Sequence, residues 1–222
     1  MRQPGHICLV TDRKLLTPDA RTVRNELAAL EGFLEDAVEA GVDVIQLRER
    51  DLEAGQLRDL AARVGRRAAG TRTRVLVNDR VDVATAAGAD GVHLRADGPP
   101  VSRVRTLSSG RFIVGRSAHT IAEVRATDDD GADYVLFGTM FPGGSKGGPP
   151  GNDRLIVLRE AARSARTPVV AIGGIDPDRA ARCLQAGAAG VAAISIFLPE
   201  GRAPLAMGVA RAVAALRVAM VQ

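Results

Sequence analysis

Four segments of the chain repeat one pattern, in which an alanine-rich or acidic helical stretch reaches a glycine and an apolar run follows. They are "AGVDVIQL" (40–47), "AGADGVHL" (87–94), "DGADYVLF" (130–137) and "AGAAGVAA" (186–193). Glycine at that point is typical of a helix C-terminus, because it adopts the left-handed conformation that closes a helix at little cost. Each segment therefore predicts the end of a helix followed by a strand.

Four further apolar runs lie between these repeats, at 6–12, 74–79, 111–117 and 168–174. They are short and lack strict alternation, which is typical of parallel strands buried on both faces. Thr17-Pro18-Asp19 and Asp176-Pro177 have the cap residue and the proline that begin a helix.

Eight strands that alternate with helices over this length predict an α/β fold, a single (β/α)8 TIM barrel. We expect one domain over residues 1–222, since no linker or low-complexity segment interrupts the pattern. An open doubly wound sheet is the alternative fold.

Composition narrows the function classes. The chain has 222 residues, of which 46% are hydrophobic and 25% charged, with a formal net charge of +4. Its arginines are scattered and only 3% of its residues are aromatic, so we expect no nucleic-acid partner. No apolar run is long enough to cross a bilayer and the first strand begins near Ile7, so we expect a cytoplasmic protein with no membrane partner. Cys8 and Cys183 fit no metal or redox spacing and are expected to be buried thiols.

Polar residues follow the apolar interior of each predicted strand. In a barrel of this kind the active site lies at the C-terminal ends of the strands. The residues at these ends are Thr11, Asp12, Gln46, Arg48, Glu49, Arg50, Asn78, Asp79, His93, Arg95, Ser117, His119, Gly138, Thr139, Gly173, Gly174 and Ser195. Their position predicts an active site at this end of the barrel.

The sequence "QLRER" (46–50) places Gln46, Arg48 and Arg50 on one side of an extended chain, because side chains alternate along a strand. Two guanidinium groups beside an amide suit a diphosphate group or a polar heterocycle. The alternative is a salt-bridge cluster at the rim with Glu49 and Asp51.

Two stretches of the sequence suit a phosphate group. A strand ends at Gly173 and Gly174, and Ser195 follows the last strand. Backbone N–H groups after the seventh and eighth strands commonly bind phosphate in this fold, and glycine lets the backbone approach the anion. The alternative is that the two glycines only form a turn.

The segment "FPGGSKGGPPG" (141–151) does not have the spacing of a Walker P-loop. It predicts a long loop over the opening of the barrel. Its single charge, Lys146, either binds a phosphate when the loop closes or is solvated.

These motifs, taken in order, resemble the thiamine phosphate synthase/TenI family over about residues 7–200. The matching motifs are "QLRER", "VNDRVDVA", "GADGVHL", "GRSAHT", "GADYVLFG", "PVVAIGGI" and "AGAAGVAAIS". The resemblance implies a thiamine-biosynthesis enzyme with one of two activities. A synthase joins a pyrimidine diphosphate to a thiazole phosphate with Mg²⁺ and releases diphosphate. A TenI-type tautomerase moves a proton on the thiazole and needs no cofactor.

The resemblance also implies roles for individual residues. The pyrimidine diphosphate would contact Gln46, Arg48, Arg50, Asn78, Ser117 and Lys146, and the thiazole phosphate would contact Gly174, Ile194 and Ser195. Arg48 and Lys146 would also help catalysis by neutralising the leaving diphosphate. One Mg²⁺ ligand matches Asp79, and the catalytic histidine of the tautomerase matches His119. The alternative for Asp79 is a structural role, paired with Arg80 or Arg95.

The chain departs from the synthase pattern after its fourth strand. Synthases have His-x-Gly-Gln-x-Asp there, and that aspartate is the second Mg²⁺ ligand. Here the ligand position holds Gly98, Asp97 comes one residue early, and Arg95 replaces a glycine. Mg²⁺ requires oxygen ligands in near-octahedral geometry, so a one-residue displacement matters. The loop at 141–151 also lacks the threonines of the synthase Thr-x-Thr-Lys motif.

These departures favour a metal-independent thiazole tautomerase in which His119 transfers the proton, since histidine exchanges protons near neutral pH. The alternative is an Mg²⁺-dependent synthase, which the intact Asn78-Asp79 pair supports. A non-catalytic binder of thiazole phosphate is a third hypothesis, and another phosphate-handling barrel enzyme is a fourth. The expected partner is a small phosphate substrate. The helix expected at 203–222 either only completes the barrel or also lines a homodimer interface.

Overall fold

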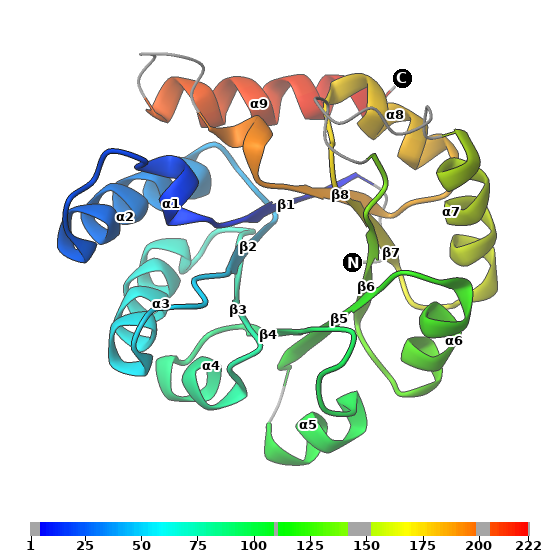
Figure 1. Cartoon of the computed structure of the whole chain (residues 1–222), viewed down its shortest axis with the longest axis horizontal. Coiled ribbons are helices and arrows are strands. Elements are labelled where there is room, and N and C mark those ends of the chain that lie inside the picture. The colour runs from blue at the N-terminus through cyan, green and yellow to red at the C-terminus, as the bar shows by residue number, and fades with distance from the viewer. Residues whose placement is uncertain (1–4, 109–110, 142–151, 199–204, 222) are drawn as a thin grey trace.

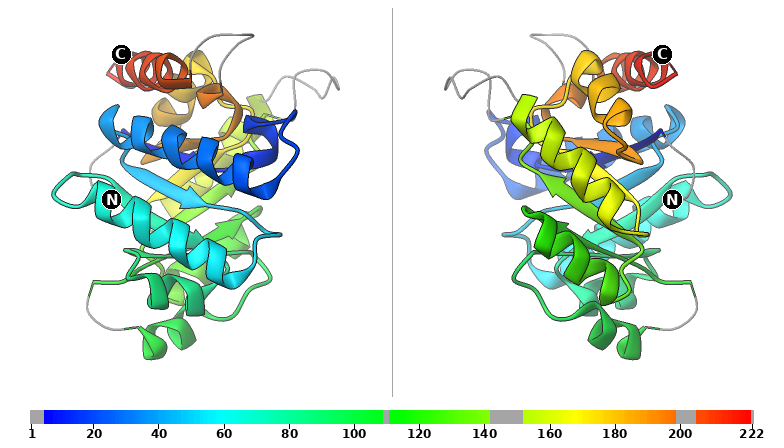
Figure 2. Two further views of the ribbon diagram at one scale, coloured as in Figure 1. Left: turned by 90° about the vertical axis from the view of Figure 1, so that its left-hand side faces the viewer. Right: turned by 90° about the vertical axis from the view of Figure 1, so that its right-hand side faces the viewer.

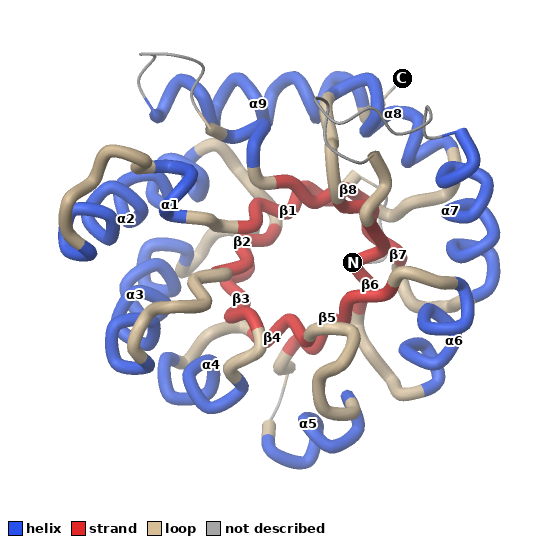
Figure 3. Tube along the Cα trace, in the orientation of Figure 1, coloured by secondary structure: helices blue, strands red, loops and turns tan. Residues whose placement is uncertain are grey.

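The eight predicted strands form a closed parallel barrel. The computed structural model describes residues 5–108, 111–141, 152–198 and 205–221. The strands are β1 (His6–Val10), β2 (Val44–Leu47), β3 (Arg74–Asn78), β4 (Gly91–Leu94), β5 (Ile113–Ala118), β6 (Tyr134–Gly138), β7 (Val169–Ile172) and β8 (Gly190–Ala193). They pair in sequence order and β8 closes on β1, which makes the central ring of Figures 1 and 3. The predicted barrel is thus confirmed, and the open sheet is not formed.

The helices lie along the outside of the strands (Figure 2). They are α1 (Arg13–Leu16), α2 (Val23–Glu39), α3 (Ala54–Ala68), α4 (Val81–Ala87), α5 (Val101–Leu107), α6 (Ile121–Asp129), α7 (Asn152–Ser164), α8 (Pro177–Gln185), the short 3₁₀ helix η1 (Ser195–Phe197) and α9 (Leu205–Ala219). Asp176 begins α8 as predicted, accepting a hydrogen bond from the Arg179 backbone at 2.8 Å. The start predicted at Thr17-Pro18 is wrong, because Thr22 caps α2 instead, through a 3.2 Å bond from the Asn25 backbone.

The repeated glycines have the conformation that the pattern predicted. Gly41, Gly88, Gly131 and Gly187 have φ values of 78°, 65°, 84° and 100°, each just after a helix and before an even-numbered strand. Other residues rarely adopt this left-handed conformation, so glycine ends the helix and turns the chain toward the barrel.

The repeat also contains an aspartate whose function the structure shows. Two residues after the glycine, Asp43, Asp90 and Asp133 each accept a backbone N–H from the preceding strand, at Ile7 (2.8 Å), Val75 (2.8 Å) and Val114 (2.7 Å). These bonds join neighbouring strands at the N-terminal end of the barrel. The fourth repeat has Ala189 at this position and lacks the bond.

The core has two parts. One lies inside the barrel and consists of Cys8, Val10, Val44, Leu76, Tyr134, Leu136, Val170 and Ala192; the other packs the strands against the helices. Tyr134 fits inside because β5 has a glycine opposite it. A β-carbon at Gly115 would lie 2.1 Å from the Tyr134 ring, so only glycine leaves room for the aromatic side chain.

Three further expectations concern the last helix, the possibility of a membrane span and the two cysteines. Helix α9 packs against α2 and α8 and so completes the outer ring, while the expected homodimer stays a prediction. Among the described helices, none has the length and hydropathy to cross a membrane. Cys8 and Cys183 are buried free thiols as expected, and burial raises the pKa of each to about 12.

Candidate active site

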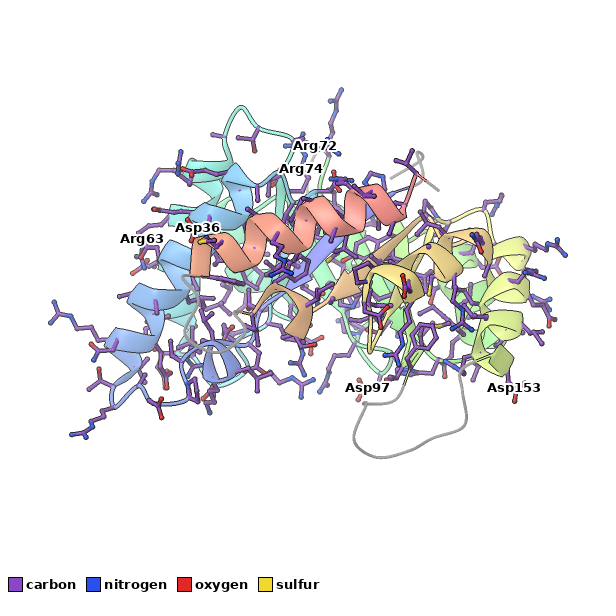
Figure 4. The ribbon with its side chains drawn as sticks, turned by 90° about the horizontal axis from the view of Figure 1, so that it is seen from above. Asp36, Arg63, Arg72, Arg74, Asp97 and Asp153 are labelled. Carbon is purple, nitrogen blue, oxygen red and sulfur yellow. The ribbon has the colours of Figure 1, made fainter. Side chains whose placement is uncertain are left out.

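The polar residues predicted at the strand ends gather at one end of the barrel, here called the mouth. Figure 4 shows Asp97, which follows β4, at the opposite end of the molecule from Arg74, which begins β3. All strands are parallel, so their C-terminal ends meet on the side of Asp97. The mouth is therefore where side chains from different strands can act together.

An amide pair lies on the floor of the mouth. The Gln46 Nε2 group donates a hydrogen bond to Asn78 Oδ1 at 2.9 Å, and Gln46 is only 2% exposed. The pairing of β2 with β3 brings these side chains together, because both point into the barrel from adjacent strands. The structure thus joins two of the residues that the sequence singled out.

Two arginines follow the end of β2. Arg48 is half-buried and its backbone N–H binds Thr11 Oγ1 at 2.9 Å, while Arg50 is exposed. Burial, together with the charge of Arg50, lowers the pKa of the Arg48 guanidinium. A closely spaced pair of cations is unfavourable in the free protein, and a bound anion would relieve the repulsion.

The alternative salt-bridge cluster exists, but a different arginine supplies its cation. The buried Arg13 Nη1 group lies 3.0 Å from Glu49 Oε2 and 2.6 Å from Asp51 Oδ1. No ion pair among the described residues includes Arg48 or Arg50. Arg13 was not predicted, and it leaves the two arginines of "QLRER" available for an anionic ligand.

The predicted metal ligand Asp79 is bound by Arg95, which follows β4 and is one of the two arginines expected as its alternative partners. Its Oδ2 atom lies 2.7 Å from Arg95 Nε, and its Oδ1 atom accepts the Arg95 backbone N–H at 3.1 Å. Arg95 Nε also lies 3.3 Å from Asp97 Oδ1. Gly98 has no side chain to offer, and within the described residues no group of three or more acidic, histidine or cysteine side chains could hold a metal ion.

A buried hydrogen-bond chain lies under the mouth. His93 is 2% exposed, and its ring joins Tyr134 Oη (2.9 Å from Nδ1) to Ser117 Oγ (2.9 Å from Nε2). Burial lowers the pKa of His93 to about 3, so its ring is neutral at physiological pH. The chain orients the Ser117 hydroxyl, which the sequence had predicted as a substrate contact.

His119 follows β5 and lies exposed at the rim. Its Nδ1 atom is 2.7 Å from the carbonyl oxygen of Gly138 on β6. A carbonyl oxygen only accepts, so Nδ1 carries the proton and the Nε2 lone pair of the neutral ring is available as a base. This geometry is compatible with proton transfer.

Residues after β7 and β8 form a backbone surface suited to an anion. The pairing of Ile172 with Ala192 places Gly173 and Gly174 beside Ile194 and Ser195. A β-carbon at Gly174 would lie 2.1 Å from the Phe141 carbonyl oxygen, so this position requires glycine. Ser195 begins η1, and the first N–H groups of a helical turn have no partner within it. The arrangement supports the predicted phosphate contacts.

Lys146 lies outside the described residues. Sequence reasoning missed three residues of the site, Arg13, Tyr134 and Arg116. Arg116 positions the segment after β4 by donating hydrogen bonds to the carbonyl oxygens of Ala96 (2.8 Å) and Gly98 (2.9 Å). Arg116 belongs to the motif "GRSAHT", so its place in that motif was the only available signal.

The fold and the polar mouth define a (β/α)8-barrel enzyme. A family model described as thiamine monophosphate synthase matches residues 8–197. The chain belongs to this family, as its motifs had indicated.

Individual relatives agree with this assignment. The chain is 44% identical over 162 residues to the thiamine-phosphate synthase of Anaeromyxobacter dehalogenans, covering 73% of this chain and 72% of the relative. It is 40% identical over 164 residues to that of Methanocella arvoryzae, covering 74% and 77%. Among solved structures, thiamine phosphate pyrophosphorylase from Pyrococcus furiosus matches with a TM-score of 0.78 at 28% identity, covering 97% of this chain and 95% of the other.

Proposed function

We propose that the chain is a thiamine-phosphate synthase, a transferase that joins a pyrimidine diphosphate to a thiazole phosphate and releases diphosphate. The main support for the proposal is that relatives 40–44% identical over 73–74% of the chain are named thiamine-phosphate synthase. These names support the alternative of the sequence analysis better than the tautomerase that its motifs favoured. The tautomerase becomes the second candidate.

The reaction breaks the bond between the pyrimidine methylene carbon and a diphosphate oxygen. The electron pair of that bond leaves with the diphosphate, and the thiazole nitrogen lone pair forms the new carbon–nitrogen bond. Negative charge grows on the leaving group while positive charge grows on the pyrimidine. Arg48 and Arg50 are suited to stabilise the leaving group, because preorganised cations act most strongly where charge develops.

The other substrate contacts follow from the geometry of the mouth. The Gln46–Asn78 amide pair offers donors and acceptors to the edge of a heterocycle. Ser117, oriented by His93, offers a hydroxyl group from the adjacent wall. The backbone near Gly174 and Ser195 is suited to the thiazole phosphate, and this would set the distance between the two reacting atoms.

A synthase of this family is expected to use Mg²⁺, but the described residues do not fit that ion. Mg²⁺ takes oxygen ligands in octahedral geometry. Both oxygens of Asp79 contact Arg95, and Gly98 supplies no carboxylate. No step of the proposed reaction is therefore assigned to a metal here.

The proposal is tested by incubating the purified protein with both substrates and measuring thiamine phosphate by chromatography, with Mg²⁺ and with EDTA. We expect product, and we expect Arg50→Gln to lower kcat/KM at least tenfold. Arg80→Gln is the matched control, because it removes an arginine whose side chain is held by Asp82. The proposal would be rejected if no thiamine phosphate formed with Mg²⁺ and none formed with EDTA.

The second candidate, the thiazole tautomerase, is favoured by the hydrogen bond between His119 and Gly138, which leaves Nε2 free to accept a proton. Its test supplies the non-aromatic thiazole phosphate tautomer and follows formation of the aromatic product. Conversion that disappears in His119→Gln, together with no thiamine phosphate in the first assay, would establish the tautomerase instead.

A further inference from the structure

Arg95 lies between two carboxylates at the mouth. Its Nε atom is 2.7 Å from Asp79 Oδ2 and 3.3 Å from Asp97 Oδ1, so a single nitrogen contacts both acidic side chains. Its backbone N–H donates to the second oxygen of Asp79 at 3.1 Å. The two carboxylates therefore already share one positive charge that belongs to the chain itself.

The surrounding backbone keeps this arrangement in place. Asp79 has a φ of 64°, a left-handed conformation that few residues other than glycine adopt, and its N–H donates to the His93 carbonyl oxygen at 2.8 Å. Arg116 binds the carbonyl oxygens of Ala96 and Gly98 and so fixes the segment that follows Arg95. Asp79 is thus held from β3 with its carboxylate directed at the next strand.

A divalent cation at Asp79 would compete directly with Arg95. Such an ion needs carboxylate oxygens at close range, and here both oxygens of Asp79 are occupied by Arg95: Oδ1 accepts its backbone N–H and Oδ2 forms an ion pair with its Nε. The positive charge of the guanidinium would also repel the ion at that distance. We propose that the guanidinium of Arg95 occupies the position of a divalent metal ion at Asp79 and excludes that ion. Arg95 thereby lowers the affinity of the mouth for a divalent metal ion.

The proposal predicts that removing the guanidinium creates metal affinity. It concerns the free protein without substrate, so it stands or falls separately from the synthase proposal. The side chain of Arg95 is 55% exposed, so Arg95→Gln does not disturb the core. The variant leaves Asp79 and Asp97 close together with no cation between them.

The experiment titrates Mn²⁺ into the free protein and measures bound ion by electron paramagnetic resonance. We expect Arg95→Gln to bind Mn²⁺ at least tenfold more tightly than the wild type, and Arg95→Gln/Asp79→Asn to lose that gain. Arg80→Gln removes the same charge from the lining of the same pocket without releasing Asp79, and it should bind like the wild type.

Two results would overturn the proposal. Equal Mn²⁺ affinity of the wild type and Arg95→Gln would show that the guanidinium does not compete with the ion. An equal gain in Arg80→Gln would show that only the overall charge matters. Circular dichroism and the Tm of each variant verify folding, and Arg95→Ala repeats the test with a second side chain that carries no charge.

Discussion

The buried histidine under the mouth makes the stability of this protein depend on pH. His93 has both ring nitrogens hydrogen-bonded inside the barrel, and burial lowers its pKa from an ordinary value of 6.5 to about 3. The unfolded chain therefore binds a proton below pH 6.5, whereas the folded protein does not until about pH 3. Stability from this group is present above pH 6.5 and falls as the pH drops through that window.

The magnitude follows from the width of the window. Each pKa unit corresponds to about 1.4 kcal/mol, so lowering the pH from about 7 to about 4.5 should cost about 2.5 kcal/mol of unfolding free energy through His93 alone. His93→Gln replaces the ring with an amide that does not titrate. The variant should lose about 2.5 kcal/mol less than the wild type over the same interval, whatever its stability at pH 7.

The assay is urea denaturation followed by circular dichroism at several pH values. Other groups titrate in this range, including His6, whose pKa is lowered mainly by burial. The difference between wild type and His93→Gln at each pH cancels these contributions. Parallel pH curves for the two proteins would refute the reasoning, because they would mean that His93 is protonated as easily in the folded protein as in the unfolded chain.

Three further predictions concern the mouth. Gly174→Ala, which forces a β-carbon against a backbone carbonyl oxygen, should raise KM for the thiazole phosphate at least tenfold in steady-state kinetics; an unchanged KM would exclude this backbone as its anchor. Arg13→Met should lower the unfolding free energy by about 3–5 kcal/mol in urea, because Glu49 is left buried without its cation, and a loss below about 1 kcal/mol would contradict that role. Asn78→Ala should raise KM for the pyrimidine diphosphate and lower the unfolding free energy by about 1–3 kcal/mol, since Gln46 loses its buried acceptor. If both values are unchanged, the amide pair contributes neither to substrate binding nor to stability.

The fold could be predicted because its signals are local. A glycine after a helix and an apolar run before the next polar residue are readable within eight residues. Four repeats of this pattern, together with the four apolar runs between them, predicted eight strands. The start of α2 could not be read correctly. Thr17-Pro18 and Thr22 both have cap chemistry, and only Thr22 is followed by a segment whose apolar face reaches the core, at Leu30 and Phe33.

The partners of most polar and charged residues could not be predicted in the same way. Arg13 and Glu49 are 36 residues apart, and His93 and Tyr134 are 41 residues apart. Such contacts depend on the register between strands, which a pattern along the chain does not contain. The sequence therefore identified residues that reach the mouth, but apart from the Arg80 or Arg95 pairing considered for Asp79 it did not show which of them bind one another.

Those long-range pairs decide the electrostatic character of the mouth. Glu49 is neutralised by Arg13, and Asp79 by Arg95, so both carboxylates contribute little net negative charge. The two arginines of "QLRER" take part in none of the ion pairs among the described residues, and they retain their positive charge beside the neutral amide pair. A mouth of this kind attracts an anion and repels a free cation. The same pairs therefore support the proposed diphosphate substrate, and they explain why the affinity of the free protein for a divalent metal ion should depend on Arg95.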